Sequence, residues 1–410
     1  MFARAALVLA VLVGMAAPAR AQRSGDDALR AVAEHAAPPG DHAYPVVELV
    51  TMGVGSLIWE RHGHIALCVV YADPAQDTCF NYGVADFTHP LDMTLGFFRG
   101  THSFWADRMD PNNMLAVYAY ADRTIWVQPL PLTPDQKQKT IERLEHDILP
   151  DNRYYAYDHF WDNCTTRIRD IIDDATGGSL RAMTEPSDGK TYRDLAREGF
   201  IGMPSMSRTS LLITDIAMGR VTDRVPTYYE RMFLPQFLRE AVAKKFGVQP
   251  VPIYMRRECA GSSAKNCIER GVDVPDDGPS GRVWFALIIL VLTAPAWATR
   301  KWGRFQRTGM AFAVIPQFLL GLILWVLAII SPLPYVHWNE TCLVLLPLDL
   351  CLLFLRPAWR RKYARARVVE LGLCAALLAV GVLKQPLWEV LLWPLIPAAV
   401  VGFWPERDKK

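Results

Sequence analysis

The sequence predicts an α+β exported domain followed by an all-α membrane domain. Three observations support this fold class. The first 21 residues have the features of a signal peptide, residues 46–260 combine strand and helix patterns, and five apolar segments follow Arg282. The hydrophobic content of 51% and the net charge of +2 average over these unlike regions. The composition of the whole chain therefore identifies neither domain, and the sequence gives no reason to expect a nucleic-acid partner.

The chain opens with MFARAALVLAVLVGMAAPARAQ, in which Arg4 is the first charge and an apolar run leads to an A-x-A sequence before Gln22. This is the order of residues in a cleavable signal peptide. An uncleaved anchor is the alternative, but the run is short and ends in small residues, which favours cleavage. We assign 1–21 to the signal peptide and 22–45, rich in Ala, Pro and Gly, to a flexible leader.

The apolar segments predict a five-span membrane domain over 283–404. The loops RKWGRFQR and RPAWRRKYARAR, after the first and third segments, are strongly basic, whereas SPLPYVHWNE and KQP carry little basic charge. The positive-inside rule places the basic loops in the cytoplasm, and the large N-terminal domain then lies in the periplasm. Four spans, with the last Pro-broken segment lying at the interface, is the alternative. The five segments are about 283–299, 309–331, 341–355, 368–382 and 386–404.

The predicted signal peptide, leader and membrane segments leave three further regions of the chain. Residues 46–260 form one exported cysteine domain, long enough to bury a sizeable core, and 261–282 form a linker. Residues 405–410 form a cytoplasmic tail. The protein is expected in the inner membrane, with several spans and its N-terminal domain in the periplasm.

Strand patterns dominate the first part of the exported domain. YPVVELVTMG, HIALCVVY, LAVYAYA and TIWVQPL have strand-like composition, and Asp122-Arg123 joins the last two like a hairpin turn. TPDQKQKTIERLEHDIL begins with a capping box formed by Thr133 and Gln136, so it predicts a helix. A second helix is predicted from Asn163 to about Ala175, because apolar residues recur there at spacings of three and four before two glycines.

Cys164 lies at the start of that second helix, after Asp162 or Asn163 as the natural N-cap. Unpaired N–H groups and the positive end of the helix dipole favour a thiolate at this position, and the same N–H groups can hold an oxyanion. The alternative is a small apolar residue on the inner stripe of the helix. Position alone does not separate a nucleophile from a structural cysteine.

Counting cysteines favours the nucleophile. Cys259 and Cys267 bracket a short loop and suit a disulfide in an oxidising compartment, and Cys68 and Cys79 are a second pair of candidates. Cys164 is left over in the exported domain, where an unpaired thiol is either buried or reactive. The remaining cysteines, Cys342, Cys351 and Cys374, lie in the membrane segments.

A nucleophilic cysteine needs a base, and WERHGHIALCVV supplies two histidines. His64 begins an alternating strand in which small residues follow on the same face, leaving room for another side chain, and His62 lies one pleat earlier. Either histidine is otherwise a polar residue at a strand edge. Zinc bound by His62 and His64 is a second alternative, with Asp158 and His159 as the best further ligands; we predict no metal.

The order of His64 before Cys164 reverses that of papain-like enzymes and fits a permuted papain-like domain, which can keep the same geometry. GHIAL, FNYGVADF, DNCTTRIRD and VHWNETCLVLLPLDL resemble the Lnb family of bacterial lipoprotein N-acyltransferases. That resemblance implies a periplasmic catalytic domain followed by a five-helix membrane domain. It also implies that His64 and Cys164 are catalytic, as in the related NlpC/P60 and lecithin:retinol acyltransferase folds.

Those relatives often carry a second histidine about one strand beyond the first. This chain has Asn81, Tyr82 and Asp86 there instead, so these are the candidates for the residue that orients His64. Further residues are candidates for oxyanion or substrate positioning, although a cap, a surface residue and a solvated charge are the plain alternatives. They are Asn163, Thr165, Arg167, as a contact to a phosphate, and His62.

The resemblance implies acyl transfer through a Cys164 thioester to the α-amine of a lipidated N-terminal cysteine, without a cofactor. The expected partners are diacylated lipoproteins, a phospholipid or lipoprotein glyceryl ester as acyl donor, and the bilayer. Two other classes remain open. One is an NlpC/P60-type cell-wall peptidase or amidase, or a lipid esterase, with the same Cys–His pair, and the other is a non-enzymatic envelope protein that binds lipid.

Overall fold

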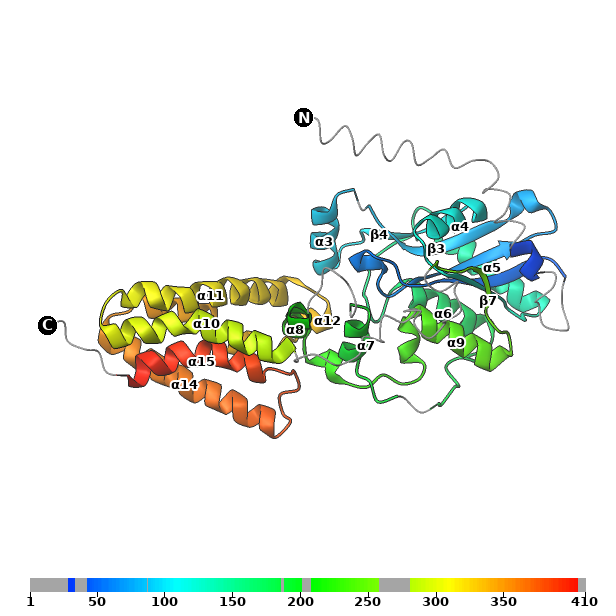
Figure 1. Ribbon diagram of the computed structural model, residues 1–410. Coiled ribbons are helices and arrows are strands. Elements are labelled where there is room, and N and C mark those ends of the chain that lie inside the picture. The colour runs from blue at the N-terminus through cyan, green and yellow to red at the C-terminus, as the bar shows by residue number, and fades with distance from the viewer. Residues whose placement is uncertain are drawn as a thin grey trace, which may run out of the picture. The chain divides into compact units, whose positions relative to one another are not determined.

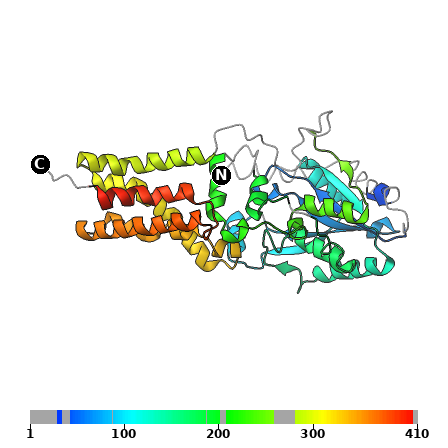
Figure 2. The ribbon, with the colours of Figure 1, turned by 90° about the horizontal axis from the view of Figure 1, so that it is seen from below.

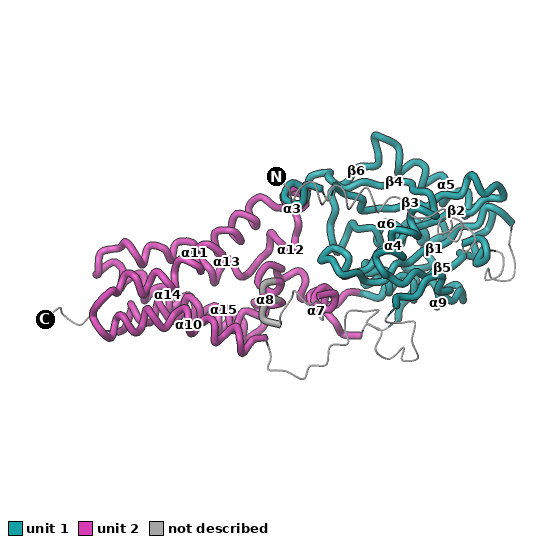
Figure 3. The backbone as a smooth tube through the Cα atoms, turned by 45° about the horizontal axis from the view of Figure 1, so that its top comes forward, with its two compact units in different colours: residues 1–93, 101–187, 227–271 teal, residues 94–100, 188–226, 272–410 magenta. Residues whose placement is uncertain are grey.

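The computed structural model divides the chain into two compact units, one containing a β-sheet and one helical (Figure 3). Unit 1 comprises residues 1–93, 101–187 and 227–271, and unit 2 comprises 94–100, 188–226 and 272–410. The structure describes residues 29–33, 43–86, 88–185, 188–200, 208–257 and 281–404. The predicted signal peptide, most of the leader, most of the linker, the cytoplasmic tail, Cys259 and Cys267 lie outside these residues.

Unit 1 is built on a seven-stranded antiparallel sheet in the order β6-β4-β3-β2-β1-β5-β7 (Figure 1). The central strands β1 and β2 are buried along nearly their whole length, which explains their continuous apolar sequences. The strands are β1 Val46–Met52, β2 His64–Val70, β3 Thr78–Val84, β4 Phe104–Met109, β5 Ile125–Pro129, β6 Tyr154–Tyr155 and β7 Val251–Tyr254.

Helices cover both faces of this sheet (Figures 1 and 2). On one face, residues of α5 (Pro134–Asp147), α6 (Cys164–Ala175) and α9 (Pro235–Phe246) pack on alternate residues of β1 and β2 in one apolar core. On the other face, α4 (Pro111–Tyr120) and the short helix at 29–33 pack on the remaining residues of the same strands. Three 3₁₀ turns complete the unit: η1 Ile58–Glu60, η2 Pro74–Gln76 and η4 Glu230–Phe233. The fold is α+β, as the sequence predicts.

Most of the local signals in the sequence correspond to elements of the structure. The predicted strands at β1, β2 and β5 are present, and Thr133 and Gln136 form the capping box of α5. Asn163 is the N-cap of α6, which makes Cys164 the first residue of that helix. Cys68 and Cys79, opposite each other on β2 and β3, form a disulfide.

The prediction of a strand over LAVYAYA is wrong, because these residues belong to helix α4. The Asp110 side chain accepts a hydrogen bond from the N–H of Asn113, and Pro111 occupies the first turn. An N-cap followed by proline is a helix start signal that outweighs the β propensity of the valine and tyrosines. Asp122-Arg123 is therefore a helix-to-strand connection and not a hairpin turn.

Unit 2 contains the apolar C-terminal helices. Three segments are long and apolar enough to cross a membrane, namely Gly281–Trp302, Gln306–Ile330 and Pro334–Leu353, within the residues that the structure describes. The first two are α10 and α11, and the third is broken into α12 (Pro334–His337), α13 (Thr341–Val344) and η6 (Pro347–Leu353). The two further predicted spans correspond to α14 (Pro357–Ala379), whose first half is basic, and α15 (Trp388–Phe403), which is short.

Unit 2 also takes in residues that the sequence analysis placed in the exported domain. These are 94–100, at the end of α3 (Pro90–Phe98), and 188–226, which contains α7 (Tyr192–Glu198), α8 (Arg208–Ala217) and η3 (Arg220–Asp223). Buried amides tie α8 to the loops beside the membrane helices. Asn339 donates to the carbonyl of Ile216 over 2.9 Å, and Gln385 donates to that of Met218 over 2.8 Å.

We predict the membrane topology from the loop charges and from the five helical segments. Reporter fusions after Arg304 and Arg361 should be cytoplasmic, and a fusion at Asn339 should be periplasmic. A fusion after Trp404 separates the two models, because it should be cytoplasmic if α15 spans the bilayer and periplasmic if α15 lies at the interface. Alkaline phosphatase and fluorescent-protein fusions measure this, and a reversed pattern at any of the first three positions would contradict the orientation.

Candidate active site

The N-terminus of α6 is held in place by Asn163. The Asn163 Oδ1 accepts hydrogen bonds from the backbone N–H groups of Thr165 (2.8 Å) and Thr166 (2.9 Å). Its Nδ2 donates to the carbonyls of His159 and Phe233. The side chain is thus committed to capping the helix and to tying it to neighbouring loops. We therefore assign Asn163 a positioning role and not that of an oxyanion donor.

Cys164 is a buried free thiol directly after this cap. Burial raises the pKa of the thiol. Hydrogen bonds from the Thr165 hydroxyl and from the backbone N–H groups of Ile65 and Thr165 act in the opposite direction, as does the charge of Arg123. The Thr165 Oγ1 lies 3.8 Å from Sγ. Because Ile65 directly follows His64, the bond from its N–H places the thiol at the beginning of β2.

His64 is held by Asn81 of the neighbouring strand. The His64 Nε2 lies 3.1 Å from the Asn81 Oδ1, and the Asn81 Nδ2 is directed to the sulfur of Met114 over 3.5 Å. An amide oxygen only accepts, so Nε2 carries the hydrogen and Nδ1 is left as the proton acceptor of the ring. Asn81 is therefore the one candidate among the three that the structure brings to His64.

Burial and the positive charge of Arg123 lower the pKa of His64 to about 4, although the bond to Asn81 raises it. The ring is neutral at pH 7, as a general base must be before it takes a proton. The neighbouring thiol is protonated at rest, because burial raises its pKa. At rest, both the thiol and the imidazole are therefore neutral. A thiolate would form only when the proton leaves the thiol during the reaction.

The hydrogen-bonded ladder between β2 and β3 ends beside His64 and Ile65. The ladder between β2 and β3 ends at the pair Ala66–Asn81, so His64 and Ile65 lie beyond its last pair. The register of β3 against β4 shifts between Asn81 and Val84, and Gly83 within that shift has a φ of +80°. His64 stacks on Tyr118 of α4, on one face of the sheet, while α6 lies on the other face. The opening lets a thiol from α6 bond to the backbone of β2.

The positive charge of Arg123 acts on both His64 and Cys164. Arg123 is buried, its Nε donates to the carbonyl of Gly53 over 2.8 Å, and its guanidinium lies 4.7 Å from the ring centroid of Tyr118. Its positive charge favours the thiolate and disfavours the imidazolium. Sequence analysis missed it because α4 was predicted as a strand, which made Arg123 a turn residue.

Tyr155 of β6 borders the thiol from the other side. Burial and the nearby thiol raise the pKa of its phenol. The guanidinium of Arg167 lies 3.6 Å from the centroid of its ring and bonds to Asp162 over 2.6 and 2.9 Å. Arg167 therefore positions Tyr155, and its charge is already paired with a carboxylate. This geometry therefore does not favour a contact between Arg167 and a phosphate.

Tyr82 and Asp86 do not approach His64. Tyr82 alternates with Asn81 along β3, so its ring enters the core on the α6 face and its hydroxyl donates to Asp147 over 2.9 Å. Asp86 lies exposed beyond the strand, where bonds from Thr88 and His89 lower its pKa to about 2. The structure thus excludes both from the orienting role, for reasons of strand alternation and distance along the chain.

His62 lies near the loop before α6 and not on Asn81. Its ring packs edge-on against His159 with a centroid separation of 4.7 Å, and burial lowers the pKa of both imidazoles, that of His159 to about 4. The described residues contain no group of three or more His, Cys, Asp or Glu side chains arranged to hold a metal ion. The zinc alternative, with Asp158 and His159 as further ligands, therefore gains no support from the described part of the chain.

The lowered pKa of His64 predicts a loss of stability in acid. The unfolded chain takes up a proton near pH 6.5, whereas the folded protein does so only near pH 4, so stability present above pH 6.5 is lost as pH falls towards 4. The contribution lost by pH 4 is roughly 3 kcal/mol. Thermal unfolding of the full chain should show a shallower pH dependence in His64→Gln than in the native protein. His102→Gln, at an exposed position, is the control and should match the native protein; equal slopes for all three would contradict the assignment.

Comparison with known proteins agrees with the arrangement of this unit. A family model described as the Lnb N-terminal periplasmic domain matches residues 41–198, which include His64, Asn81 and Cys164. No curated protein and no solved structure matches the chain. The matched domain and the apolar helices after it make this a membrane protein with a periplasmic N-terminal domain. Residues 41–198 match the Lnb N-terminal periplasmic domain, and this match supports a relationship of that part of the chain to the Lnb-type family.

Proposed function

We propose that this protein is a cysteine-dependent lipoprotein N-acyltransferase, in which Cys164 is the nucleophile, His64 the base and Asn81 the residue that orients the base. The observation that carries the proposal is the meeting of three elements at one point. The thiol of Cys164 on α6 interacts with the backbone N–H of Ile65 on β2. Ile65 directly follows His64, whose Nε2 is held by Asn81 of β3. A nucleophile, a base and an orienting group in this relation are the requirements of covalent acyl transfer.

The first half-reaction uses a membrane ester as donor. The Nδ1 of His64 takes the proton from Cys164 as Sγ attacks the ester carbonyl, and a tetrahedral oxyanion forms. When that intermediate collapses, the carbon–oxygen ester bond breaks and His64 returns the proton to the leaving alcohol oxygen. The products are a thioester on Cys164 and a lyso lipid. Arg123 favours the transient thiolate, because its charge lies in the field of the thiol.

In the second half-reaction, the α-amine of a diacylated lipoprotein attacks the thioester carbonyl. His64 takes a proton from the amine and passes it to Sγ as the carbon–sulfur bond breaks, which releases the N-acylated lipoprotein and the free thiol. Converting a thioester to an amide is downhill, so neither half-reaction needs a cofactor. The same residues therefore serve twice, first with an alcohol as leaving group and then with the thiol.

Two groups are the candidate donors for the oxyanions of both steps. The backbone N–H of Cys164 belongs to the first turn of α6, where N–H groups have no intrahelical acceptor, while those of Thr165 and Thr166 are taken by Asn163. The hydroxyl of Tyr155 lies close to the thiol. We assign the oxyanion hole to these two groups.

The substrate class follows from the membrane location of the enzyme. The lipoprotein acceptor and the ester donor, a phospholipid or a glyceryl ester of another lipoprotein, are both held in a bilayer, and the apolar helices hold the enzyme there. A cell-wall hydrolase would act on the cell-wall polymer outside the bilayer and would not need this anchoring. The deciding experiment is mass spectrometry of a reporter lipoprotein's N-terminus in cells with and without the gene. An unacylated amine in both would contradict the proposal.

Substitutions should separate the three roles. Cys164→Ala and His64→Ala should each lower N-acylation at least about 10³-fold, because each residue acts only with the other. Asn81→Ala should lower kcat by roughly 10²-fold through misorientation of the imidazole, and Asn81→Gln should not restore it. The control is His62→Gln, which leaves the His64–Asn81 bond in place. Loss of activity in His62→Gln with full activity in His64→Ala would move the base to His62.

The acyl-enzyme should be observable. With donor lipid present and acceptor absent, the purified protein should carry a hydroxylamine-labile acyl mass on the peptide that contains Cys164, because a thioester in a buried site hydrolyses slowly. A diacylated lipopeptide with a free α-amine should discharge it, and the same peptide acetylated at that amine should not. Discharge at equal rates with both peptides would identify a hydrolase. The absence of any adduct in all donor conditions would contradict the mechanism.

A further inference from the structure

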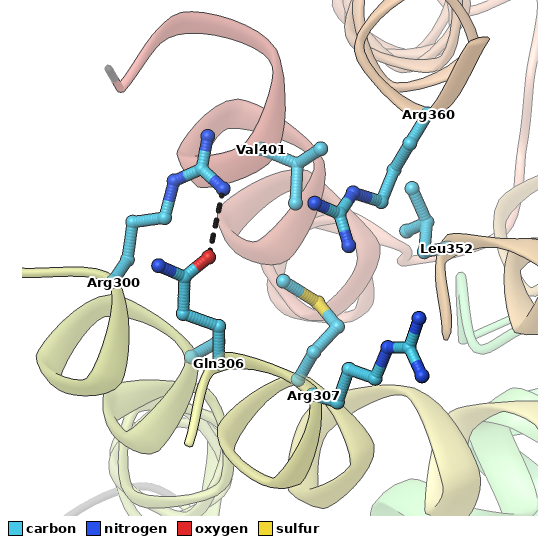
Figure 4. Close-up of a pocket in the computed structure, with 8 residues that line it drawn as sticks. Arg300, Gln306, Arg307, Leu352, Arg360 and Val401 are labelled. Atoms are coloured by element: carbon cyan, nitrogen blue, oxygen red, sulfur yellow. Dashed lines mark hydrogen bonds between the residues drawn. The ribbon is translucent and has the colours of Figure 1, made fainter. Parts of the chain in front are cut away.

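A second cluster of polar side chains lies in unit 2, among the helices at 281–404. Arg300 of α10, Arg307 of α11 and Arg360 of α14 line one pocket together with Gln306 (Figure 4). The remaining lining residues are apolar and belong to a buried cluster that joins α10, α11, η6 and α15. They are Ala296, Met310, Leu352 and Val401. The pocket therefore combines a cationic wall from three helices with an apolar floor.

The three arginines differ in burial: Arg300 is built into the helix bundle, Arg360 is half-buried and Arg307 is exposed. Arg300 is only 3% exposed, and its guanidinium donates to Gln306 Oε1 over 3.3 Å and to the carbonyl of Trp404 over 2.9 Å. These bonds hold the guanidinium at the junction of α10, α11 and the end of α15. In Figure 4 the side chains of Arg307 and Arg360 lie on the opposite side of Val401 from Arg300. Three positive charges thus border one small opening.

The pocket lies at the depth of lipid headgroups. Trp302 and Trp359, which end α10 and begin α14, are 71% and 63% exposed, and exposed tryptophans at helix ends are typical of the interface between hydrocarbon and water. The loops at this end are the basic ones, which places it in the cytoplasm. The anionic lipids of the inner leaflet are therefore within reach of the pocket, and basic pockets between membrane helices bind such headgroups.

We propose that the mouth of this pocket binds the phosphate of an anionic glycerophospholipid from the cytoplasmic leaflet, with Arg307 and Arg360 as the phosphate ligands and the buried charge of Arg300 behind them. The guanidinium fork matches phosphate oxygens, and the apolar floor receives the first methylenes of an acyl chain. The site is on the opposite side of the membrane from Cys164, so it does not supply the acyl donor. It anchors the helix ends and holds α10, α11 and α14 together.

The test is native mass spectrometry of the full chain in detergent, titrated with phosphatidylglycerol or with phosphatidylcholine of the same acyl chains. The first lipid should bind more tightly. Arg307→Gln and Arg360→Gln should each weaken its binding about fivefold, and the double variant about 25-fold. The matched controls Arg304→Gln and Arg361→Gln, basic residues on the same segments that do not line the pocket, should leave it within about twofold.

Equal losses in the pocket and control variants would overturn the proposal, because they would indicate attraction by the general positive charge of this surface. Equal binding of the two lipids would also overturn it. Inorganic phosphate at millimolar concentration is the competing probe. Retention of phosphatidylglycerol in its presence supports a lipid site in which the acyl chain contributes, whereas displacement by phosphate alone would overturn the assignment to a lipid.

Discussion

The candidate site depends on one approach, that of the backbone N–H of Ile65 to the sulfur of Cys164, where it favours the thiolate. It joins the first residue of a capped helix to the second residue of a central strand, and each partner comes from an element fixed for other reasons. The apolar stripe of α6 is buried against the sheet, and Asn163 determines where the helix begins. The thiol is placed by the core, so its position needs no flexible loop.

The two faces of the sheet contribute different chemistry. The α6 face supplies Cys164, the proposed nucleophile, while the α4 face supplies Tyr118 and, just after α4, Arg123. The groups meet only because the β2–β3 ladder ends at Ala66–Asn81. A ladder continuing past that pair would fill the opening with backbone hydrogen bonds. The irregularity in β3 is thus a requirement of the site and not a defect of the sheet.

Much of the fold, and the positions of His64 and Cys164 within it, were predictable from the sequence, because their signals are local. Alternation identified β2 and the face of His64, and a cap followed by an apolar stripe identified α6. Asn81 was one of three candidates, since strand alternation alone does not say which residue of β3 is paired with Ala66. Tyr155 had no local signal at all: it lies in a two-residue strand whose existence depends on β4. Arg123 was hidden by the wrong assignment of α4, where β propensity was given more weight than the Asp-Pro start.

The disulfide between Cys68 and Cys79 has a consequence for when the site can exist. It joins β2 and β3 at the pair two residues along from Ala66–Asn81, the last pair before the opening. A slip of one residue between these strands would turn Asn81 to the other face and away from His64. The covalent bond excludes that slip, but it forms only where the compartment is oxidising. The strand register that aligns His64 with Asn81 is therefore fixed covalently only in an oxidising compartment. A chain still in the reducing cytoplasm has the same sequence but lacks this crosslink.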